Sequence, residues 1–333
     1  MSTFIIAELS ANHNGDLDLA IKTIQQAAQC GVDAVKLQTY TADTLTIDHD
    51  GPGFVIEGGL WDGRRLHELY LEAFTPWEWH ERLFEVARKC GLVCFSSPFD
   101  ASAVDLLEDL GNPIYKIASF EITDIPLIEY AASKGKPMVI STGIATDQEI
   151  LDALDACRRM GNEQVTLLKC TSAYPAPIED ANLKTMVDMR SRYGVETGLS
   201  DHTMGHSVAV AAVALGATMV EKHFILDRSM GGVDSAFSME PSEFKLMVDE
   251  IRKTEAALGV VDYSLTEKKK AARQFARSLY VVKDIVMGES FTMENVRSIR
   301  PGYGLPPKYL REVLGKAARR SIQRGTPLDI TDL

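Results

Sequence analysis

Several features that would point to a membrane protein, a secreted protein or a dinucleotide enzyme are missing from this sequence of 333 residues. No apolar run approaches the roughly 20 residues that span a bilayer, so we expect no membrane segment. The N-terminal residues turn polar after a short apolar run and carry no basic region, so we expect no signal peptide. No G-x-G-x-x-G follows a strand-like run, which removes the main reason to expect a dinucleotide-binding sheet.

Basic residues are outnumbered by acidic ones, and cysteines are few. The formal net charge of −12 argues against nucleic acid as a partner, because phosphate backbones need a basic surface. It does not exclude a small anionic substrate, since a few lysines can gather in one pocket. The cysteines show no C-x-x-C pair, which predicts reduced, mostly buried thiols in a cytoplasmic protein. They are Cys30, Cys90, Cys94, Cys157 and Cys170.

The sequence does contain a regular alternation of short apolar runs with amphipathic stretches, several of which end in glycine. The apolar runs cover residues 4–9, 33–38, 92–97, 114–119, 137–142, 165–170, 195–200 and 218–224. Three of the joins, QCGVDAVKL, KCGLVCFSS and ALGATMVEK, read as the same phrase. Eight strand–helix units predict an α/β fold of the closed (β/α)₈-barrel type rather than an open doubly wound sheet.

The pattern changes near residue 262, where a Lys-rich segment follows the eighth amphipathic stretch. We expect a catalytic barrel over 1–262, a linker over 263–276, and a small, mostly β domain with one short helix over 277–333. The segment 39–76, between the second and third strands, is far longer than the usual βα connection. A loop of that length at the carboxyl face of a barrel predicts a functional role.

Catalytic groups of a barrel lie at the carboxyl ends of its strands, and here those ends are polar. Lysines in apolar strands are costly to bury unless they meet an anion or a carboxylate, so Lys36 and Lys116 are expected to point inward. For Lys169 and Lys222 an outward or surface-paired position is equally compatible with the sequence. Two lysines and several hydroxyls around one cavity suit a small substrate with phosphate and carboxylate groups.

Two histidines, His202 and His223, end neighbouring strands. Neutral imidazoles brought together in this way can hold a divalent transition metal and leave open positions for substrate or water. A structural hydrogen-bonding role is the alternative for each of them. The remaining histidines of the insertion and the following helix are expected at the surface: His49, His67 and His80.

The motifs IIAELSANHNGD, VKLQTY, FSSPFD, YKIAS, STGIAT, KCTSAYPAP, GLSDHTMG and EKHFILDR together resemble the sialic acid synthase family over the whole barrel. The tail RSLYVVKDIVMGESFTMENVRSIRPGYGLPPKYL resembles that family's C-terminal antifreeze-like (SAF) domain. Within the family, LWDGRRLHELYLEAFTPWEWHERLF and GVDSAFSMEP are similar to the pseudaminic acid branch rather than the N-acetylneuraminate branch.

The resemblance implies roles for individual positions. Those that match phosphoenolpyruvate-binding residues are Lys36, Ser97, Lys116, Ser119, Ser141 and Ser200. The matches to the ligands of a divalent metal, Mn²⁺ or Mg²⁺, are His202 and His223. Those around the sugar and the reacting water are Glu8, Gln38, Glu121 and Asp234. Ser172 stands where the family often has Asn, and Arg300 matches an arginine that reaches the partner subunit's barrel in a domain-swapped homodimer.

The reaction implied is the condensation of phosphoenolpyruvate with 2,4-diacetamido-2,4,6-trideoxy-L-altrose, giving a nonulosonic acid and phosphate. Whether Glu8 or Asp234 orients the water stays open. A synthase of legionaminic or N-acetylneuraminic acid is the nearest alternative. A barrel synthase of the 3-deoxy-heptulosonate type would lack the SAF-like tail, and a non-enzymatic sugar-binding or ice-binding protein would not need polar groups on every strand end.

Overall fold

The computed structural model describes residues 2–333, which form two compact units, one ending at Gly259 and the other spanning Val260–Leu333. In the first unit eight parallel strands close into a barrel in sequence order, with β8 paired back to β1. The strands are β1 Phe4–Glu8, β2 Ala34–Thr39, β3 Val93–Pro98, β4 Tyr115–Ile117, β5 Met138–Ser141, β6 Val165–Cys170, β7 Glu196–Asp201 and β8 Met219–His223. The predicted (β/α)₈ barrel is confirmed: five strands lie within predicted apolar runs, and β2, β3 and β7 each extend one residue beyond theirs.

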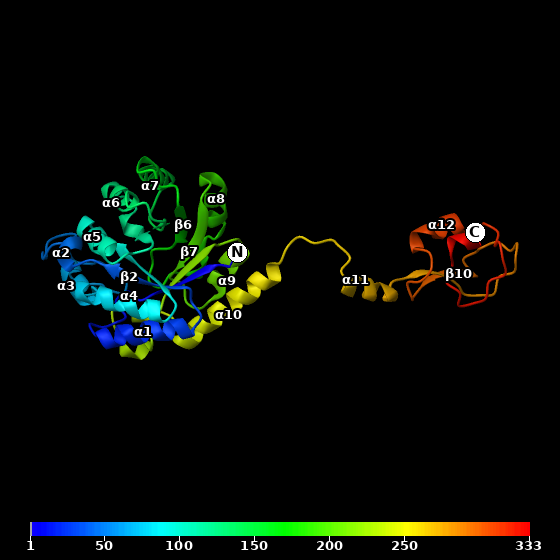
Figure 1. Ribbon diagram of the computed structural model, residues 1–333, viewed down its shortest axis with the longest axis horizontal. Coiled ribbons are helices and arrows are strands. Elements are labelled where there is room, and N and C mark those ends of the chain that lie inside the picture. The colour runs from blue at the N-terminus through cyan, green and yellow to red at the C-terminus, as the bar shows by residue number, and fades with distance from the viewer. Residues whose placement is uncertain (1) are drawn as a thin grey trace. The chain divides into compact units, whose positions relative to one another are not determined.

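Helices surround the strands, as Figure 1 shows. They are α1 Leu17–Gln29, α4 His80–Lys89, α5 Ala101–Asp109, α6 Ile125–Ala132, α7 Asp147–Arg159, α8 Lys184–Tyr193, α9 Ser207–Ala214 and α10 Pro241–Leu258. Side-chain caps fix where several begin: Asp16, Asp100 and Thr146 each accept backbone N–H groups of the first turn. No helix within residues 2–333 is both long enough and apolar enough to cross a membrane.

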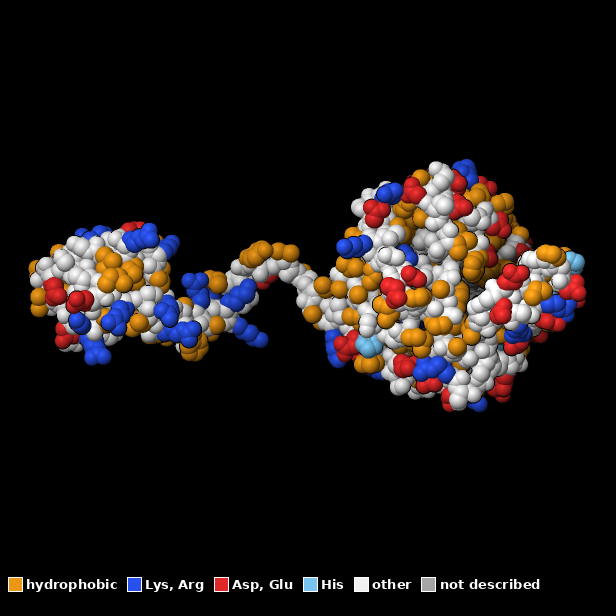
Figure 2. All heavy atoms as spheres, turned by 180° about the vertical axis from the view of Figure 1, so that it is seen from behind, with side chains coloured by type: hydrophobic (Ala, Val, Ile, Leu, Met, Phe, Trp, Pro, Cys, Tyr) orange, Lys and Arg blue, Asp and Glu red, His pale blue; other side chains and the backbone are white. Residues whose placement is uncertain are grey.

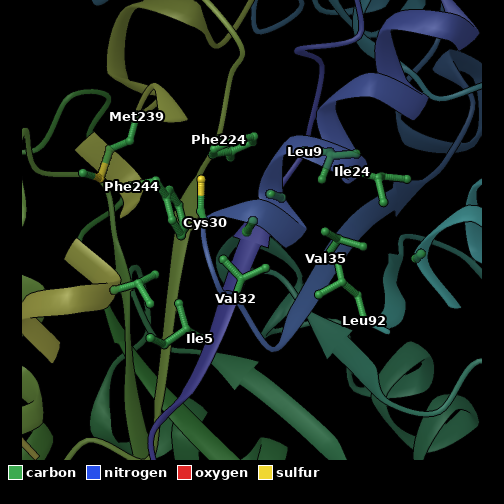
Figure 3. Close-up of a cluster of buried hydrophobic side chains, with 14 of the residues drawn as sticks. Ile5, Leu9, Ile24, Cys30, Val32, Val35, Leu92, Phe224, Met239 and Phe244 are labelled. Carbon is green, nitrogen blue, oxygen red and sulfur yellow. The ribbon is translucent and has the colours of Figure 1, made fainter. Parts of the chain in front are cut away.

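The main core lies between the barrel wall and its helices. Ile5 and Val35 point outward from β1 and β2 and pack with Ile24 of α1 and Phe244 of α10, all completely buried (Figure 3). Burial of each such side chain contributes about 1.5–3 kcal/mol. The predicted reduced thiols are confirmed, because all five cysteines are free and four are buried.

A second, smaller apolar cluster fills the lower interior of the barrel. Ile6, Ala34 and Phe95 pack together there and are fully buried. Because side chains alternate along a strand, the residue two positions further along points to the same side. The next inward residues on these strands are therefore Glu8, Lys36 and Ser97, so a polar layer lies directly above the apolar one.

The segment 39–76 is partly ordered by short elements: α2 Ala42–Leu45, a bridge between Val55 and Arg65, and α3 Leu66–Ala73. A 3₁₀ turn, Trp77–Trp79, then leads into α4. His80, expected at the surface, is completely buried, because its Nε2 pairs with Thr39 Oγ1 at 2.8 Å behind the barrel wall. That expectation was wrong.

The second unit has an antiparallel pair, β9 Ser278–Val281 and β10 Val296–Ile299, over its own apolar core. Its short helical elements are α11 Glu267–Ala272, η6 Arg273–Phe275, η7 Pro307–Tyr309, α12 Leu310–Val313 and η8 Ile330–Asp332. All side chains from 260 to 277 are exposed, including those of α11. Arg300 is exposed as well, on the turn after β10.

Candidate active site

Two buried lysines share carboxylates inside the barrel. Lys36 Nζ lies 2.8 Å from Glu8 Oε2, 3.2 Å from Ser97 Oγ and 3.6 Å from Glu221 Oε1. Lys116 Nζ lies 2.9 Å from the same Glu221 Oε1. Lys116 is on β4 and Glu221 on β8, and a contact between opposite strands of an eight-stranded barrel must run through its interior. Both lysines therefore point inward.

Burial and charge compete in this cluster. Burial disfavours the charge of Lys36, but Glu221 and Glu8 outweigh it and raise the pKa of Lys36. For Lys116 burial dominates and lowers the pKa, although Glu221 opposes the change. Burial also opposes ionisation of Glu221, yet Lys116 and Lys36 bring its pKa down to about 2. The interior thus holds an ionised network, which an anionic ligand would enter by competing for the lysines.

Five serines predicted at this site line the interior or its mouth. Ser97 accepts from Lys36, and Ser200 Oγ donates to Glu221 Oε1 at 3.1 Å. Ser172, which stands where the resembled family often has Asn, donates from Oγ to Ser119 Oγ at 2.9 Å. Ser141 Oγ is buried without a hydrogen-bond partner among residues 2–333. A hydroxyl left unpaired in the interior is a group with which a ligand can bond.

Gly143 explains how the two serines come so close. A Cβ at this position would collide with the hydroxyls of both Ser119 and Ser172. The neighbouring Ile144 N–H donates to Ser119 Oγ at 3.1 Å. The loop after β5 therefore passes the serine pair at backbone distance, which only glycine allows.

The two histidines meet at the barrel mouth, with ring centroids 5.3 Å apart. Burial lowers the pKa of His202 to about 4, and burial together with His202 lowers that of His223. Both imidazoles are therefore neutral near pH 7, which is the form that binds metal ions. His202 Nδ1 lies 3.0 Å from Thr171 O, so it carries the proton and leaves Nε2 free.

These two residues fit a divalent cation as a pair. His223 Nδ1 is buried and has no hydrogen-bond partner among residues 2–333, and Asp234 Oδ2 lies 3.8 Å from it. Within the same residues no group of three His, Cys, Asp or Glu side chains is close enough to hold a metal by itself. A cation at His202 and His223 would therefore take its remaining ligands from water or substrate.

Three predicted carboxylates surround these groups. Gln38 Nε2 donates to Glu8 Oε1 at 3.0 Å, and burial raises the pKa of Glu8. Ser10 Oγ donates to Asp234, whose pKa burial also raises. Burial raises the pKa of Glu121, just after β4, to about 7, and its Oε2 has no partner among residues 2–333. All three carboxyls can hold a proton more readily than an exposed one.

An aromatic cluster stands beside the histidines, and its three members come from distant segments. Trp61 belongs to the long β2–α3 segment, Tyr174 follows β6, and Phe237 follows β8. Tyr174 lies 4.5 Å from His202 between ring centroids, and Phe237 lies 4.9 Å from His223. Trp61 packs on Tyr174 at 5.7 Å. We call these three residues the aromatic wall.

Sequence reasoning missed part of this arrangement. Glu221, which joins both lysines, was not singled out, although it stands two residues before His223 and so points to the same side of β8. Tyr174 and Phe237 were also missed, because they lie in loops that carry no periodic signal. Arg300 belongs to the second unit, Val260–Leu333.

The fold and these side chains define the class: a (β/α)₈-barrel enzyme whose site takes a small anionic substrate beside a pair of neutral histidines. The model of the NeuB family matches residues 23–263, and a SAF domain matches residues 276–333. The chain belongs to the NeuB family, and the resemblance seen in its motifs is confirmed.

Relatives match over nearly the whole chain. A pseudaminic acid synthase of Campylobacter jejuni strain 81-176 is 50% identical over 329 residues, covering 99% of this chain and 96% of the relative. The Helicobacter pylori pseudaminic acid synthase is also 50% identical, covering 99% and 97%. The crystal structure of an N-acetylneuraminic acid synthetase from Leptospira borgpetersenii superposes with a TM-score of 0.74 at 31% identity, covering 82% of this chain and 90% of that one.

Proposed function

We propose that this enzyme is a pseudaminic acid synthase, which condenses phosphoenolpyruvate with 2,4-diacetamido-2,4,6-trideoxy-L-altrose to form a nonulosonic acid and phosphate. The observation that carries this proposal is the 50% identity over 329 residues to a pseudaminic acid synthase. A legionaminic acid synthase of Campylobacter jejuni, the nearest alternative, is 38% identical over a similar length. The SAF match speaks against a 3-deoxy-heptulosonate synthase. We also propose that the enzyme acts in the cytoplasm, where phosphoenolpyruvate is made.

Phosphoenolpyruvate binds in the polar interior. Lys36 and Lys116 are the only two cationic side chains described inside the barrel, and their charges match the phosphate and carboxylate of this substrate. The serine hydroxyls supply further donors: Ser97, Ser119, Ser141, Ser172 and Ser200. Binding of the substrate replaces Glu221 as a partner of the lysines, so the site exchanges one anion for another.

The carbon–carbon bond forms when C3 of phosphoenolpyruvate attacks the aldehyde carbon of the open-chain sugar. The aldehyde oxygen takes up a proton and becomes a hydroxyl, and positive charge develops at C2. A water molecule adds to C2 and loses a proton, and phosphate then leaves with cleavage of its C–O bond. A divalent cation, Mn²⁺ or Mg²⁺, bound by His202 and His223 would polarise the aldehyde as a Lewis acid.

The carboxyl groups of the site carry out the proton transfer. Three carboxyl groups are able to accept the proton of the water that adds to C2. Glu8 is bonded to Gln38, Asp234 is bonded to Ser10, and Glu121 Oε2 has no hydrogen-bond partner among residues 2–333. General acid–base groups work best when their pKa is near the operating pH. Glu121, with a pKa of about 7, meets that condition best, which favours it as the base.

The aromatic wall fits the sugar proposed. Trp61 reaches the site because its Nε1 donates to Val233 O at 3.0 Å, beside Asp234. Two other aromatics of this region make different contacts: Phe54 packs on His49, and Trp77 Nε1 donates to Tyr40 O. Apolar rings above the histidines suit a sugar that carries a methyl group at C6 rather than a hydroxyl.

A phosphate-release assay tests the function. With phosphoenolpyruvate, the trideoxy diacetamido sugar should give a kcat/KM at least about tenfold above that of N-acetylmannosamine. Comparable values would favour an N-acetylneuraminate synthase, and preference for the legionaminate precursor would favour that enzyme. If no phosphate is released with any sugar, with or without added Mn²⁺, the alternative of a non-enzymatic binding protein would be favoured. Replacement of both His202 and His223 by Ala should abolish turnover without unfolding the barrel.

A homodimer is part of this proposal. Exposed apolar side chains follow six of the strands at the barrel mouth: Leu60, Phe120, Ile144, Ile178, Met204 and Met230. Others lie along the segment after α10: Val260, Val261, Tyr263, Leu265 and Phe275. Figure 2 shows apolar side chains, in orange, along this connecting segment. Such surfaces suit contact with a second copy, in which Arg300 of one chain would complete the partner's site.

Charge supports the same contact. Residues 260–333 carry 14 Lys and Arg against 8 Asp and Glu, whereas residues 1–259 carry 21 against 39. Opposite net charges favour docking of the C-terminal unit of one chain on the barrel of a second chain. Mixed dimers of Arg300→Ala chains with His202→Ala chains should regain one working site, since intact barrel and intact arginine then come from different chains. Activity no greater than that of the parents would contradict the swapped arrangement.

A further inference from the structure

A buried ion pair lies on the outer face of the barrel wall, beside the two histidines. Asp201 ends β7, and its register partner in the parallel ladder is Lys222 of β8. Lys222 Nζ lies 2.6 Å from Asp201 Oδ2, and both side chains are only 1% exposed. Because Glu221 points into the barrel, its neighbour Lys222 points outward, away from the substrate space.

Both members of the pair are hydrogen-bonded to the backbone of Thr203, immediately after His202, and Asp201 itself immediately precedes it. Asp201 Oδ1 accepts the N–H of Thr203 at 2.9 Å, and Lys222 Nζ donates to Thr203 O. The backbone before and after His202 is therefore tied to one ion pair. On the neighbouring strand the lysine of the same pair immediately precedes His223. One pair thus joins the two short segments, Asp-His and Lys-His, that present both imidazoles.

A buried pair of this kind is not required for stability. Removing two charges from water costs several kcal/mol per ion, and replacement by apolar residues is often neutral or stabilising by about 1–4 kcal/mol. An ion pair instead constrains geometry, because its hydrogen bonds are made only at one separation and one orientation of the two side chains. Here that separation sets the distance between β7 and β8 at the residues where the imidazoles emerge.

We propose that Asp201 and Lys222 are positioning residues that hold the two imidazoles at the spacing a divalent cation needs. The proposal rests on the metal-dependent function proposed above. Groups that orient metal ligands without touching the metal commonly change metal affinity by about 10–100-fold when they are replaced. The pair acts on the cation through the histidines, and it lies apart from Lys36 and Lys116.

The test measures Mn²⁺ binding to the full-length protein by calorimetry. Asp201→Asn keeps an oxygen for the Thr203 N–H but removes the ion pair, and it should weaken Mn²⁺ binding at least about tenfold. Affinity for phosphoenolpyruvate without metal should change less than twofold. A matched control is Lys136→Met, which removes the partly buried pair of Lys136 with Glu108, 2.6 Å apart and outside the site. This control should bind Mn²⁺ like the wild type.

A second variant separates positioning from stability. The double replacement Asp201→Asn/Lys222→Met removes both charges but keeps an oxygen for the Thr203 N–H, so no unpaired ion is left and the melting temperature should fall less than in Asp201→Asn. Its Mn²⁺ affinity should nevertheless fall as in Asp201→Asn. Wild-type affinity in either folded variant would overturn the proposal, while the metal function would stand. Absence of Mn²⁺ binding in the wild type itself would overturn both.

Discussion

The barrel buries lysines in two ways, and the contrast separates its site from its scaffold. Inside, Lys36 and Lys116 share Glu221, and polar atoms nearby such as Ser141 Oγ stay unpaired. Outside, Lys222 is matched one to one by Asp201 and the backbone. An incompletely satisfied network leaves room for a ligand to supply the missing partners, whereas a closed pair offers it nothing.

The sharpest test of this contrast is the stability of two lysine variants. Lys222→Met leaves Asp201 buried and unpaired, so we expect the free energy of unfolding to fall by about 3–5 kcal/mol. Lys116→Met leaves Glu221 with Lys36 and Ser200 Oγ, so its loss should be no more than about 1–3 kcal/mol. Urea unfolding at pH 7 measures both. Equal losses would remove the distinction between the two kinds of lysine.

Substrate affinity should show the opposite order. Lys116→Met removes a charge-assisted contact with phosphoenolpyruvate, worth about 1.5–3 kcal/mol, so its Kd should rise at least about tenfold. Lys222→Met, measured at a temperature where it is folded, should bind phosphoenolpyruvate like the wild type. Calorimetry without the sugar gives both constants, and an unchanged Kd for Lys116→Met would contradict the assignment of the anion site.

A third prediction concerns pH. Because burial raises the pKa of Glu121 to about 7, its carboxyl is protonated at pH 6 and ionised at pH 8. If the ionised form accepts the proton of water, kcat should fall about fivefold between pH 7 and pH 6. Glu121→Gln should lower kcat and lose this acid limb; a limb of equal size in the variant would assign it to another group.

The raised pKa of Glu121 also makes the free energy of unfolding depend on pH. The folded-state pKa lies above the ordinary 4.5, so the native protein holds a proton that the unfolded chain releases between about pH 4.5 and 7. The favourable contribution of protonated Glu121 is therefore present below pH 4.5 and is lost as the pH rises to 7. Comparing urea midpoints of Glu121→Gln and wild type at pH 5 and pH 8 would reveal it.

The smallest effect on stability and substrate affinity is expected for Lys169, which is part neither of the shared network inside the barrel nor of the closed ion pair outside it. Its Nζ donates to Cys170 O at 2.7 Å and to Thr171 Oγ1 at 3.3 Å, and burial lowers its pKa. Lys169→Met should cost about 0.5–1.5 kcal/mol and leave the phosphoenolpyruvate Kd unchanged. A tenfold weaker Kd would add Lys169 to the anion site.

The parts of the molecule that repeat could be predicted from the sequence. Strand and helix periods predicted the barrel, the cost of burying lysines in apolar strands pointed to Lys36 and Lys116, and the strand ends pointed to the two histidines. Glu221 could have been found, since an inward His223 requires an inward residue two positions earlier. His80 also left a signal, because Leu83 and Ala87 share its buried face of α4.

The aromatic wall could not have been predicted in this way. Trp61, Tyr174 and Phe237 are separated by more than 60 residues, and each lies outside the eight strands. Their meeting depends on how three loops fold over the mouth, for which no periodicity exists. Trp61 is distinguished from the other aromatics of its segment by its bond to Val233 O and by its packing on Tyr174 and Phe237.

The apolar cluster of Ile6, Ala34 and Phe95 has a kinetic consequence. It fills the interior beneath the polar layer beside β1, β2 and β3, so in the proposed function the substrates enter and leave through the mouth. On β8, Glu221 lies one layer beneath His223, so a ligand at the lysines sits under one at the histidines. In the proposed function the deeper substrate is phosphoenolpyruvate, which would therefore have to bind first. At high concentration the sugar alone would block the entrance, and turnover would then slow until it dissociates.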